Sequence, residues 1–219
     1  MFADRRDAGR QLAWRLSRYA DRDDVVVLAL PRGGIPVAYE VARAIGAPLD
    51  VFVVRKLGVP GHEELAMGAI ASGDVVVLSR DLINAIGVPA DAIDDVIAAE
   101  REELERRERV YRDNAPPRRL DGKTAILIDD GLATGATMLA AVAALRKLHP
   151  RRIVVAVPVA APDTCNALAY EVDEIICYET PEPFRAVGVW YHDFAQTSDD
   201  EVRRLLAASR AGPTEAHAP

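Results

Sequence analysis

Hydrophobic residues along this chain fall into two patterns, short uninterrupted runs and longer stretches with helical spacing. Runs rich in Val, Ile and Leu, such as DVVVLAL at residues 24–30, predict strands that are buried on both faces. Such strands are predicted at residues 24–30, 48–55, 74–79, 123–128, 153–158 and 174–178. Apolar positions three and four residues apart predict helices at residues 4–19, 35–45, 137–148, 163–169 and 198–210, and a mainly helical segment at residues 80–112.

The order of these elements predicts the fold class. Strands alternate with helices from residue 24 to about residue 178, which is typical of an α/β protein with a doubly wound, mostly parallel sheet. We expect a single domain over residues 1–210, with a hood-like helical insertion at about residues 80–119 and a disordered tail at residues 211–219. Residues 56–73 contain four glycines and a proline, which indicates a long mobile loop with a short strand near residues 67–71.

Composition and charge narrow the possible functions. Half of the 219 residues are hydrophobic and the formal net charge is −7, so a broad nucleic-acid-binding surface is not expected. The charged N-terminus does not resemble a signal peptide, and no uncharged apolar stretch approaches the roughly 18 residues of a membrane span, so we expect a cytoplasmic protein. Cys165 and Cys177 fit no metal-binding spacing, and buried reduced thiols are the expected state.

The segment after the strand at residues 123–128 combines two carboxylates with a loop of small residues. Asp129 and Asp130 end the strand, and a helix begins within the loop that follows. Backbone N–H groups at a helix N-terminus, together with threonine hydroxyls, can hold a phosphate, while the carboxylates can accept hydrogen bonds from a diol. The pattern therefore favours a sugar phosphate over the alternative, a capped helix with surface aspartates. The candidate loop residues are Gly131, Leu132, Ala133, Thr134, Gly135, Ala136 and Thr137.

This strand, acid pair and small-residue loop resemble the motif that binds phosphoribosyl pyrophosphate in type I phosphoribosyltransferases. The resemblance extends over most of residues 24–195. It implies transfer of phosphoribose to a nitrogenous, purine-like base with release of pyrophosphate, assisted by Mg²⁺. It also implies that Asp129 and Asp130 lie beside the ribose, and that the protein is a homodimer.

A second candidate loop, PRGG at residues 31–34, follows the first predicted strand. Alone it predicts no more than a turn. In the family that the chain resembles, the loop at this position holds pyrophosphate, commonly through an unusual cis peptide. The resemblance thus implies that Arg32 supplies charge and that Gly33 and Gly34 supply backbone N–H groups.

A third candidate segment begins with Arg55 and Lys56. Two adjacent cations at a strand end suit a polyanion, although exposed solubilising charge is the alternative. The sequence VRKLGVPG resembles adenine phosphoribosyltransferases, in which the following loop closes over the substrates and excludes water. Of the polar residues on that loop, Glu64 is our preferred acid or base.

The acceptor base is not specified by the sequence. The stretch PEPFRAVGVWYHDF resembles oxopurine-specific enzymes, which implies that Phe184 stacks on a base and that Asp193 lies near the metal. Trp190 and Tyr191 have core packing as the alternative. Ala133, however, stands where oxopurine enzymes carry an acid, and no lysine follows Lys147 to read a base oxygen.

Three functional hypotheses follow from these segments. The first is a phosphoribosyltransferase, favoured by Arg32 and by the pair Arg55 and Lys56. The second is a regulator that binds phosphoribosyl pyrophosphate or a nucleotide without turnover. A hydrolase or phosphorylase acting on nucleotides is a weaker third.

Overall fold

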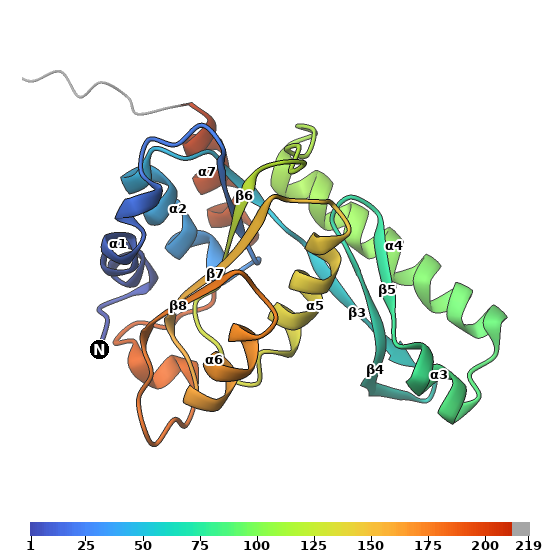
Figure 1. Ribbon diagram of the computed structural model, residues 1–219. Coiled ribbons are helices and arrows are strands. Elements are labelled where there is room, and N and C mark those ends of the chain that lie inside the picture. Colours follow the sequence, from blue (N-terminus) through green and yellow to red (C-terminus); the bar gives the residue numbers. More distant parts are fainter. Residues whose placement is uncertain (212–219) are drawn as a thin grey trace, which may run out of the picture.

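The computed structural model describes residues 1–211. Except for Ala211, the tail that the sequence predicts to be disordered lies outside the described residues. Figure 1 shows a body built around a central sheet and, on one side, a lobe formed by residues 54–112. No helix in the described part of the chain is long and apolar enough to span a membrane.

The central sheet has five parallel strands in the order β2-β1-β6-β7-β8. They are β1 (Val25–Ala29), β2 (Leu49–Val51), β6 (Thr124–Ile128), β7 (Arg152–Val159) and β8 (Glu174–Glu179). The parallel α/β fold class predicted from the sequence is confirmed. Because all five strands run in the same direction, the loops that follow β1 and β6 meet at one edge of the sheet.

Helices cover both faces of this sheet (Figure 1). Alternate residues of β1 point to opposite faces, so Val25 and Val27 join one hydrophobic core while Val26 and Leu28 join the other. The first core is covered by α1 (Arg5–Arg15), α2 (Gly34–Ile45) and α7 (Asp199–Arg210). The second is covered by α5 (Ala136–Arg146) and α6 (Pro162–Ala169). Two short 3-10 helices, η1 (Ser17–Tyr19) and η2 (Val187–Trp190), lie in the connections.

The lobe corrects the loop prediction for residues 56–73. Strands β3 (Val54–Val59) and β4 (His62–Ala71) form an antiparallel hairpin, and β5 (Val75–Leu78) adds a third strand to this second sheet. The glycines misled the prediction because they serve close packing here. A Cβ on Gly58 would lie 2.7 Å from the Glu63 oxygen, and one on Gly68 would lie 2.3 Å from the Val77 oxygen.

Two further expectations change with this second sheet. The strand predicted at residues 48–55 divides into β2 in the body and the start of β3 in the lobe. The strand predicted at residues 74–79 is β5, which belongs to the lobe and not to the central sheet. The predicted helical segment is present as α3 (Arg80–Ile86) and α4 (Ala90–Arg112).

A buried ion pair joins the end of α4 to the edge of the central sheet. The Arg112 Nε donates to Asp50 Oδ1 at 3.0 Å, and its Nη2 donates to the Val51 carbonyl at 2.7 Å. The Arg118 backbone N–H donates to the other Asp50 oxygen at 3.0 Å. Both charged side chains are about 95% buried, so their mutual pairing offsets the cost of removing them from water. This contact holds one end of the lobe against the body.

Cys165 and Cys177 form a disulfide, which corrects the expectation of reduced thiols. Cys165 lies on α6 and Cys177 on β8, and α6 packs directly against that strand. The two sulfur atoms meet because the chain passes from α6 to β8 between the two residues, and these elements pack together. Their spacing in the sequence contains no such information.

Candidate functional site

The loop that follows β6 is fixed at its start and open at its end. The Leu132 N–H donates to the Val159 carbonyl at 2.9 Å, and the Leu132 carbonyl accepts from the Ala161 N–H at 2.9 Å. Ala133, Thr134 and Thr137 are exposed, the N-cap residue of α5 is Gly135, and the Ala136 N–H makes only a long contact of 3.5 Å with the Thr134 hydroxyl. The first N–H groups of this helix are therefore available to an anion at the carboxyl end of the sheet.

Asp129 and Asp130 lie side by side in a partly buried position. Asp129 Oδ1 accepts the backbone N–H of Asp130 at 2.9 Å. Removal from water, with the neighbouring Asp130 charge as a second cause, raises the pKa of Asp129 well above its ordinary value. Burial also raises the pKa of Asp130, against the opposing effect of Arg5. Hydroxyl groups that donate to these carboxylates would favour their charged forms.

The PRGG loop packs tightly against this acid pair. A Cβ on Gly33 would lie 2.1 Å from Asp130 Oδ2, and one on Gly34 would lie 2.7 Å from the Ile128 oxygen. Without a shift of either loop, only glycine allows this approach. The two candidate loops therefore lie against each other at the carboxyl end of the sheet. The Pro31–Arg32 peptide is cis, as the family resemblance implied.

Arg5 is part of the site, although the sequence places it only on the polar side of a helix. Its Nε donates to Asp130 Oδ2 at 2.7 Å and its Nη1 donates to the Ala195 carbonyl at 2.7 Å. The guanidinium also lies 3.8 Å from the centroid of the Phe194 ring. Because 125 positions separate Arg5 from Asp130, no local pattern signals the contact.

The C-terminal stretch at residues 181–194 contacts the acid pair through Tyr191. Tyr191 is buried, and its hydroxyl donates to the Asp130 carbonyl at 2.6 Å. Phe184 is partly buried against the small cluster that contains Tyr191 and Phe2. Asp193 is exposed and accepts the Ala195 N–H at 2.9 Å. Within residues 1–211, no three His, Cys, Asp or Glu side chains are arranged to hold a metal ion.

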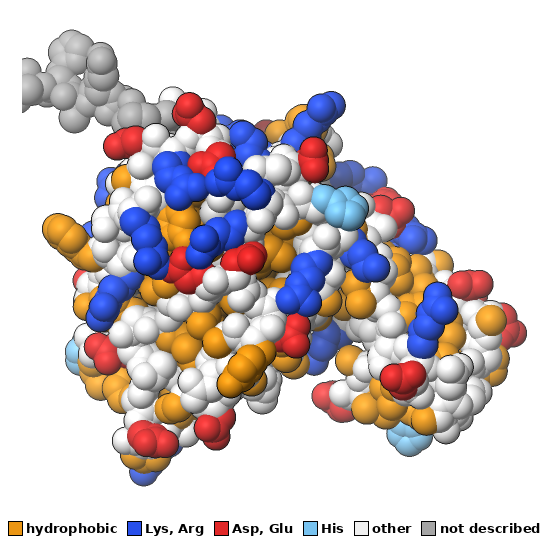
Figure 2. Space-filling model, viewed as in Figure 1, with side chains coloured by type: hydrophobic (Ala, Val, Ile, Leu, Met, Phe, Trp, Pro, Cys, Tyr) orange, Lys and Arg blue, Asp and Glu red, His pale blue; other side chains and the backbone are white. Residues whose placement is uncertain are grey.

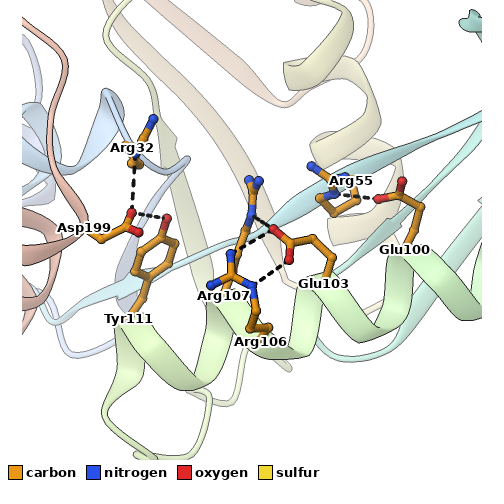
Figure 3. A network of polar contacts seen from close by, with 8 residues as sticks. All are labelled: Arg32, Arg55, Glu100, Glu103, Arg106, Arg107, Tyr111 and Asp199. Atoms are coloured by element: carbon orange, nitrogen blue, oxygen red, sulfur yellow. Dashed lines mark hydrogen bonds and ion pairs between the residues drawn. The ribbon is translucent and has the colours of Figure 1, made fainter.

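Arg32 and Arg55 both pair with carboxylates (Figure 3). Arg32 Nη1 lies 3.6 Å from Asp199 Oδ1, which also accepts the Tyr111 hydroxyl at 2.9 Å. Burial and this hydrogen bond raise the pKa of Tyr111 to about 12. Arg55 Nε donates to Glu100 Oε2 on α4 at 2.6 Å. Both guanidiniums are partly exposed, so an incoming anion can compete for them.

The structure separates the other two lobe candidates from Arg55. Lys56 is exposed and pairs across the sheet with Ala69, which in turn pairs with Val77. Val77 packs on the α5 side, so strand alternation places Lys56 on that face and Arg55 on the α4 face. Glu64 is exposed on β4, near the hairpin turn. Figure 2 shows the surface hollowed between body and lobe.

Comparison with known proteins identifies the family to which the chain belongs. The family described as "Phosphoribosyl transferase domain" matches residues 3–191. The chain belongs to this family. In this phosphoribosyl transferase domain, the matched range includes the acid pair, the small-residue loop, the PRGG loop and the whole lobe.

Individual relatives agree with this membership. Two Mycobacterium tuberculosis proteins, "Putative phosphoribosyl transferase Rv0571c" of strain H37Rv and its namesake MT0597 of strain CDC 1551, are each 46% identical over 218 residues. The alignments cover 100% of this phosphoribosyl transferase domain and 49% of each relative, so the chain spans about half the length of these proteins. The crystal structure of TT1426 from Thermus thermophilus superposes with a TM-score of 0.84 at 40% identity, over 95% of this chain and 98% of that one.

Proposed function

We propose that this phosphoribosyl transferase domain transfers phosphoribose from phosphoribosyl pyrophosphate to a nitrogenous, purine-like base. The observation that carries the proposal is the meeting of an acid pair, an exposed helix N-terminus and a glycine loop at one edge of the sheet. A sugar phosphate with a pyrophosphate group needs these three elements, because its diol, its phosphate and its leaving group have different binding requirements.

Each part of the donor has a proposed partner. The loop of residues 131–137 holds the 5-phosphate through backbone N–H groups and through the hydroxyls of Thr134 and Thr137. Asp129 and Asp130 accept hydrogen bonds from the ribose hydroxyls. The Gly33 N–H group and the Arg32 guanidinium hold the pyrophosphate, together with Lys56 or Arg55, which lie on opposite faces of the lobe sheet. The Gly34 N–H, which the family resemblance also implied, does not fit this role, because it donates to the Leu30 carbonyl at 3.1 Å.

The carboxylates of Asp129 and Asp130 also suit Mg²⁺, which prefers oxygen ligands and commonly shares them with substrate phosphates. Since no cluster of three ligating side chains is found among the described residues, the donor itself would supply most of the metal ligands. Asp193 would be a further ligand only if its exposed carboxylate turns toward the donor. When bound, Mg²⁺ would neutralise charge that develops on the leaving pyrophosphate.

The reaction requires the protein to stabilise a positive ribosyl ring. A ring nitrogen of the base forms a bond to C1 of the ribose, while the bond from C1 to the pyrophosphate oxygen breaks. The carboxylates of Asp129 and Asp130 favour the positive charge on the ring, and Arg32 with Lys56 favours the negative charge on the leaving group. Glu64 is the proposed acceptor of the base proton, and Phe184 the proposed stacking partner of the base.

Pyrophosphate release tests the proposal. The protein is incubated with phosphoribosyl pyrophosphate, Mg²⁺ and a panel of purine and pyrimidine bases, with Asp130→Asn as the control. We expect release that depends on one class of base and is lost in the variant. Donor binding without base-dependent release would instead support the regulatory hypothesis, and the absence of any donor-induced thermal shift would contradict both.

A further inference from the structure

Four arginines gather at the opposite end of the sheet from the candidate active site. Arg18 and Arg22 lie just after α1, and Arg151 and Arg152 lie at the start of β7. Together they line a cavity of about 490 Å³, which we call the arginine cavity. Figure 2 shows this gathering of basic side chains, and comparison with Figure 1 places it where β7 begins. The strands run from here toward the acid pair, so the two regions are separated by the length of the sheet.

The arginines exceed the carboxylates with which they pair. The Asp24 carboxylate forms ion pairs with Arg22, at 2.9 Å, and with Arg151. The Glu174 carboxylate forms ion pairs with Arg152, at 3.1 Å, and with Arg18. Four guanidiniums thus share two carboxylates, and each guanidinium carries five N–H donors. Most of these donors have no carboxylate to bind, in a chain whose net charge is −7.

The arginine side chains are held in place yet reach the solvent. The ring of buried Tyr19 lies 5.5 Å from the Arg18 guanidinium and 5.4 Å from that of Arg22. The Tyr19 hydroxyl donates to Glu174 at 2.6 Å, which fixes the carboxylate as well. The four arginine side chains remain between 38% and 61% exposed. Such an arrangement presents several guanidinium forks to one ligand with little ordering to be done on binding.

We propose that the arginine cavity binds a polyphosphate chain, either that of a nucleoside triphosphate or an inorganic one. Guanidinium forks match phosphate oxygens in geometry, and a chain of linked phosphates can engage arginines from both sides of the cavity. Asp24 and Glu174 each pair with two of the arginines, and Asp173, which also lines the cavity, accepts the Ile153 N–H at 2.8 Å. A ligand with several anionic groups can therefore add to these contacts without displacing them. This site is separate from the proposed active site and does not depend on its function.

A neighbouring cavity favours the nucleotide as the source of the polyphosphate. It shares Asp173 with the arginine cavity and is lined by His149, Arg146 and Tyr170. The Tyr170 side chain is 89% exposed, which is unusual for an aromatic residue that no partner covers within residues 1–211. An exposed aromatic ring beside a basic cavity offers a surface on which a base can stack while its phosphates bind the arginines.

Calorimetric titration with inorganic tripolyphosphate and with ATP tests the proposal. The test variant is Arg151→Ser/Arg152→Ser, and the matched control is Arg203→Ser, an arginine of similar exposure that pairs with Asp200 elsewhere on the surface. We expect the double variant to bind tripolyphosphate at least tenfold more weakly and the control to bind as the wild type does. Binding should also weaken as the salt concentration rises. The variants should unfold at nearly the same temperature, because exposed ion pairs contribute little to stability.

Two further measurements separate the possible sites and ligands. A Thr134→Val/Thr137→Val variant weakens the phosphate loop at the other end of the sheet and should leave the tripolyphosphate site intact. If this loop variant loses binding while the double arginine variant keeps it, the proposal is overturned. Tighter binding of ATP than of tripolyphosphate, abolished by Tyr170→Ala, would identify a nucleotide ligand, whereas equal affinities would identify inorganic polyphosphate.

Discussion

The body and the lobe contribute to the candidate site in different ways. On the body, Gly33, Asp130, Arg5 and Tyr191 are joined by close packing and by hydrogen bonds of 2.6–2.7 Å. On the lobe, Arg55, Lys56 and Glu64 lie on a hairpin, and the first of these is held by one ion pair with Glu100. The body therefore presents its carboxylates in one fixed geometry, while the lobe presents cations that can change partners.

This difference suggests a division of labour within the site. Groups that contact the ribose must be positioned closely, because small displacements of reacting groups are costly. Groups that bind the leaving pyrophosphate must also release it, so weaker and exchangeable contacts suit them. We expect changes on the body to affect turnover strongly and changes on the lobe to affect donor affinity modestly.

The largest effect is expected for Asp129→Asn. If Asp129 contacts the ribose as proposed, the loss of its carboxylate should lower turnover by about 10²–10³-fold. The free energy of unfolding should nevertheless rise by about 0.5–2 kcal/mol, because the variant removes a charge that the fold desolvates and keeps the hydrogen bond from the Asp130 N–H. Pyrophosphate release and urea denaturation measure the two effects.

The pH dependence of stability gives a second readout for the same variant. The pKa of Asp129 is raised in the folded protein, so above its ordinary value of about 4 the folded state binds more protons than the unfolded state. Stability of the wild type should therefore fall as the pH rises from about 4 through the raised pKa. In Asp129→Asn this decrease should be smaller. An equal loss of stability and activity in the variant would contradict the division of labour.

A smaller effect on turnover is expected for Gly33→Ala. The added methyl group would meet the Asp130 carboxylate at 2.1 Å, so either the Asp130 side chain or the PRGG loop must shift. A displacement of the Asp130 carboxylate at the proposed ribose site should cost about 10²-fold in turnover. Gly87→Ala is the control. The φ of 74° at Gly87 makes alanine unfavourable by about 1–2 kcal/mol, but an added Cβ would have no group within 4 Å apart from the neighbouring residues of the chain. The control should lose stability and keep its turnover, and similar turnover in both variants would show that the contact with Asp130 is unimportant.

The same contrast explains how far the sequence could predict the site. The strand, the acid pair and the helix start of residues 124–137 are local features, and their pattern predicts them correctly. The sequence pattern predicts a loop where β3 and β4 form a hairpin, because glycines usually indicate turns. In the structure, Gly58 and Gly68 instead allow neighbouring strands to approach closely.

Contacts between distant segments were outside the reach of local patterns. The pairing of Arg5 with Asp130 and the disulfide between Cys165 and Cys177 depend on how helices pack against the sheet. The sequence could therefore predict where the acid pair lies, at the end of a strand, but not the guanidinium that pairs with Asp130.

The smallest effect is expected for Glu100→Gln, which tests the lobe directly. The substitution weakens the 2.6 Å ion pair that holds Arg55 on α4 and frees the guanidinium for the donor. A partly exposed pair of this kind contributes up to about 1 kcal/mol, so KM for phosphoribosyl pyrophosphate should fall by at most about fivefold with kcat nearly unchanged. Steady-state kinetics over a range of donor concentrations measures both parameters.

Glu103→Gln is the matched control for this prediction, since Glu103 lies one turn further along α4 and is similarly exposed. Hydrogen bonds from Arg106 and Arg107 hold its pKa at about 2, and it has no pairing with Arg55. Its substitution should leave KM for the donor unchanged. If Glu100→Gln instead lowers kcat as strongly as Asp129→Asn does, then the lobe cations are positioned as closely as the body carboxylates. The contrast between the body and the lobe would then be wrong. The ion pair with Glu100 would align Arg55 for the reaction, and Arg55 would not be free to exchange Glu100 for the donor.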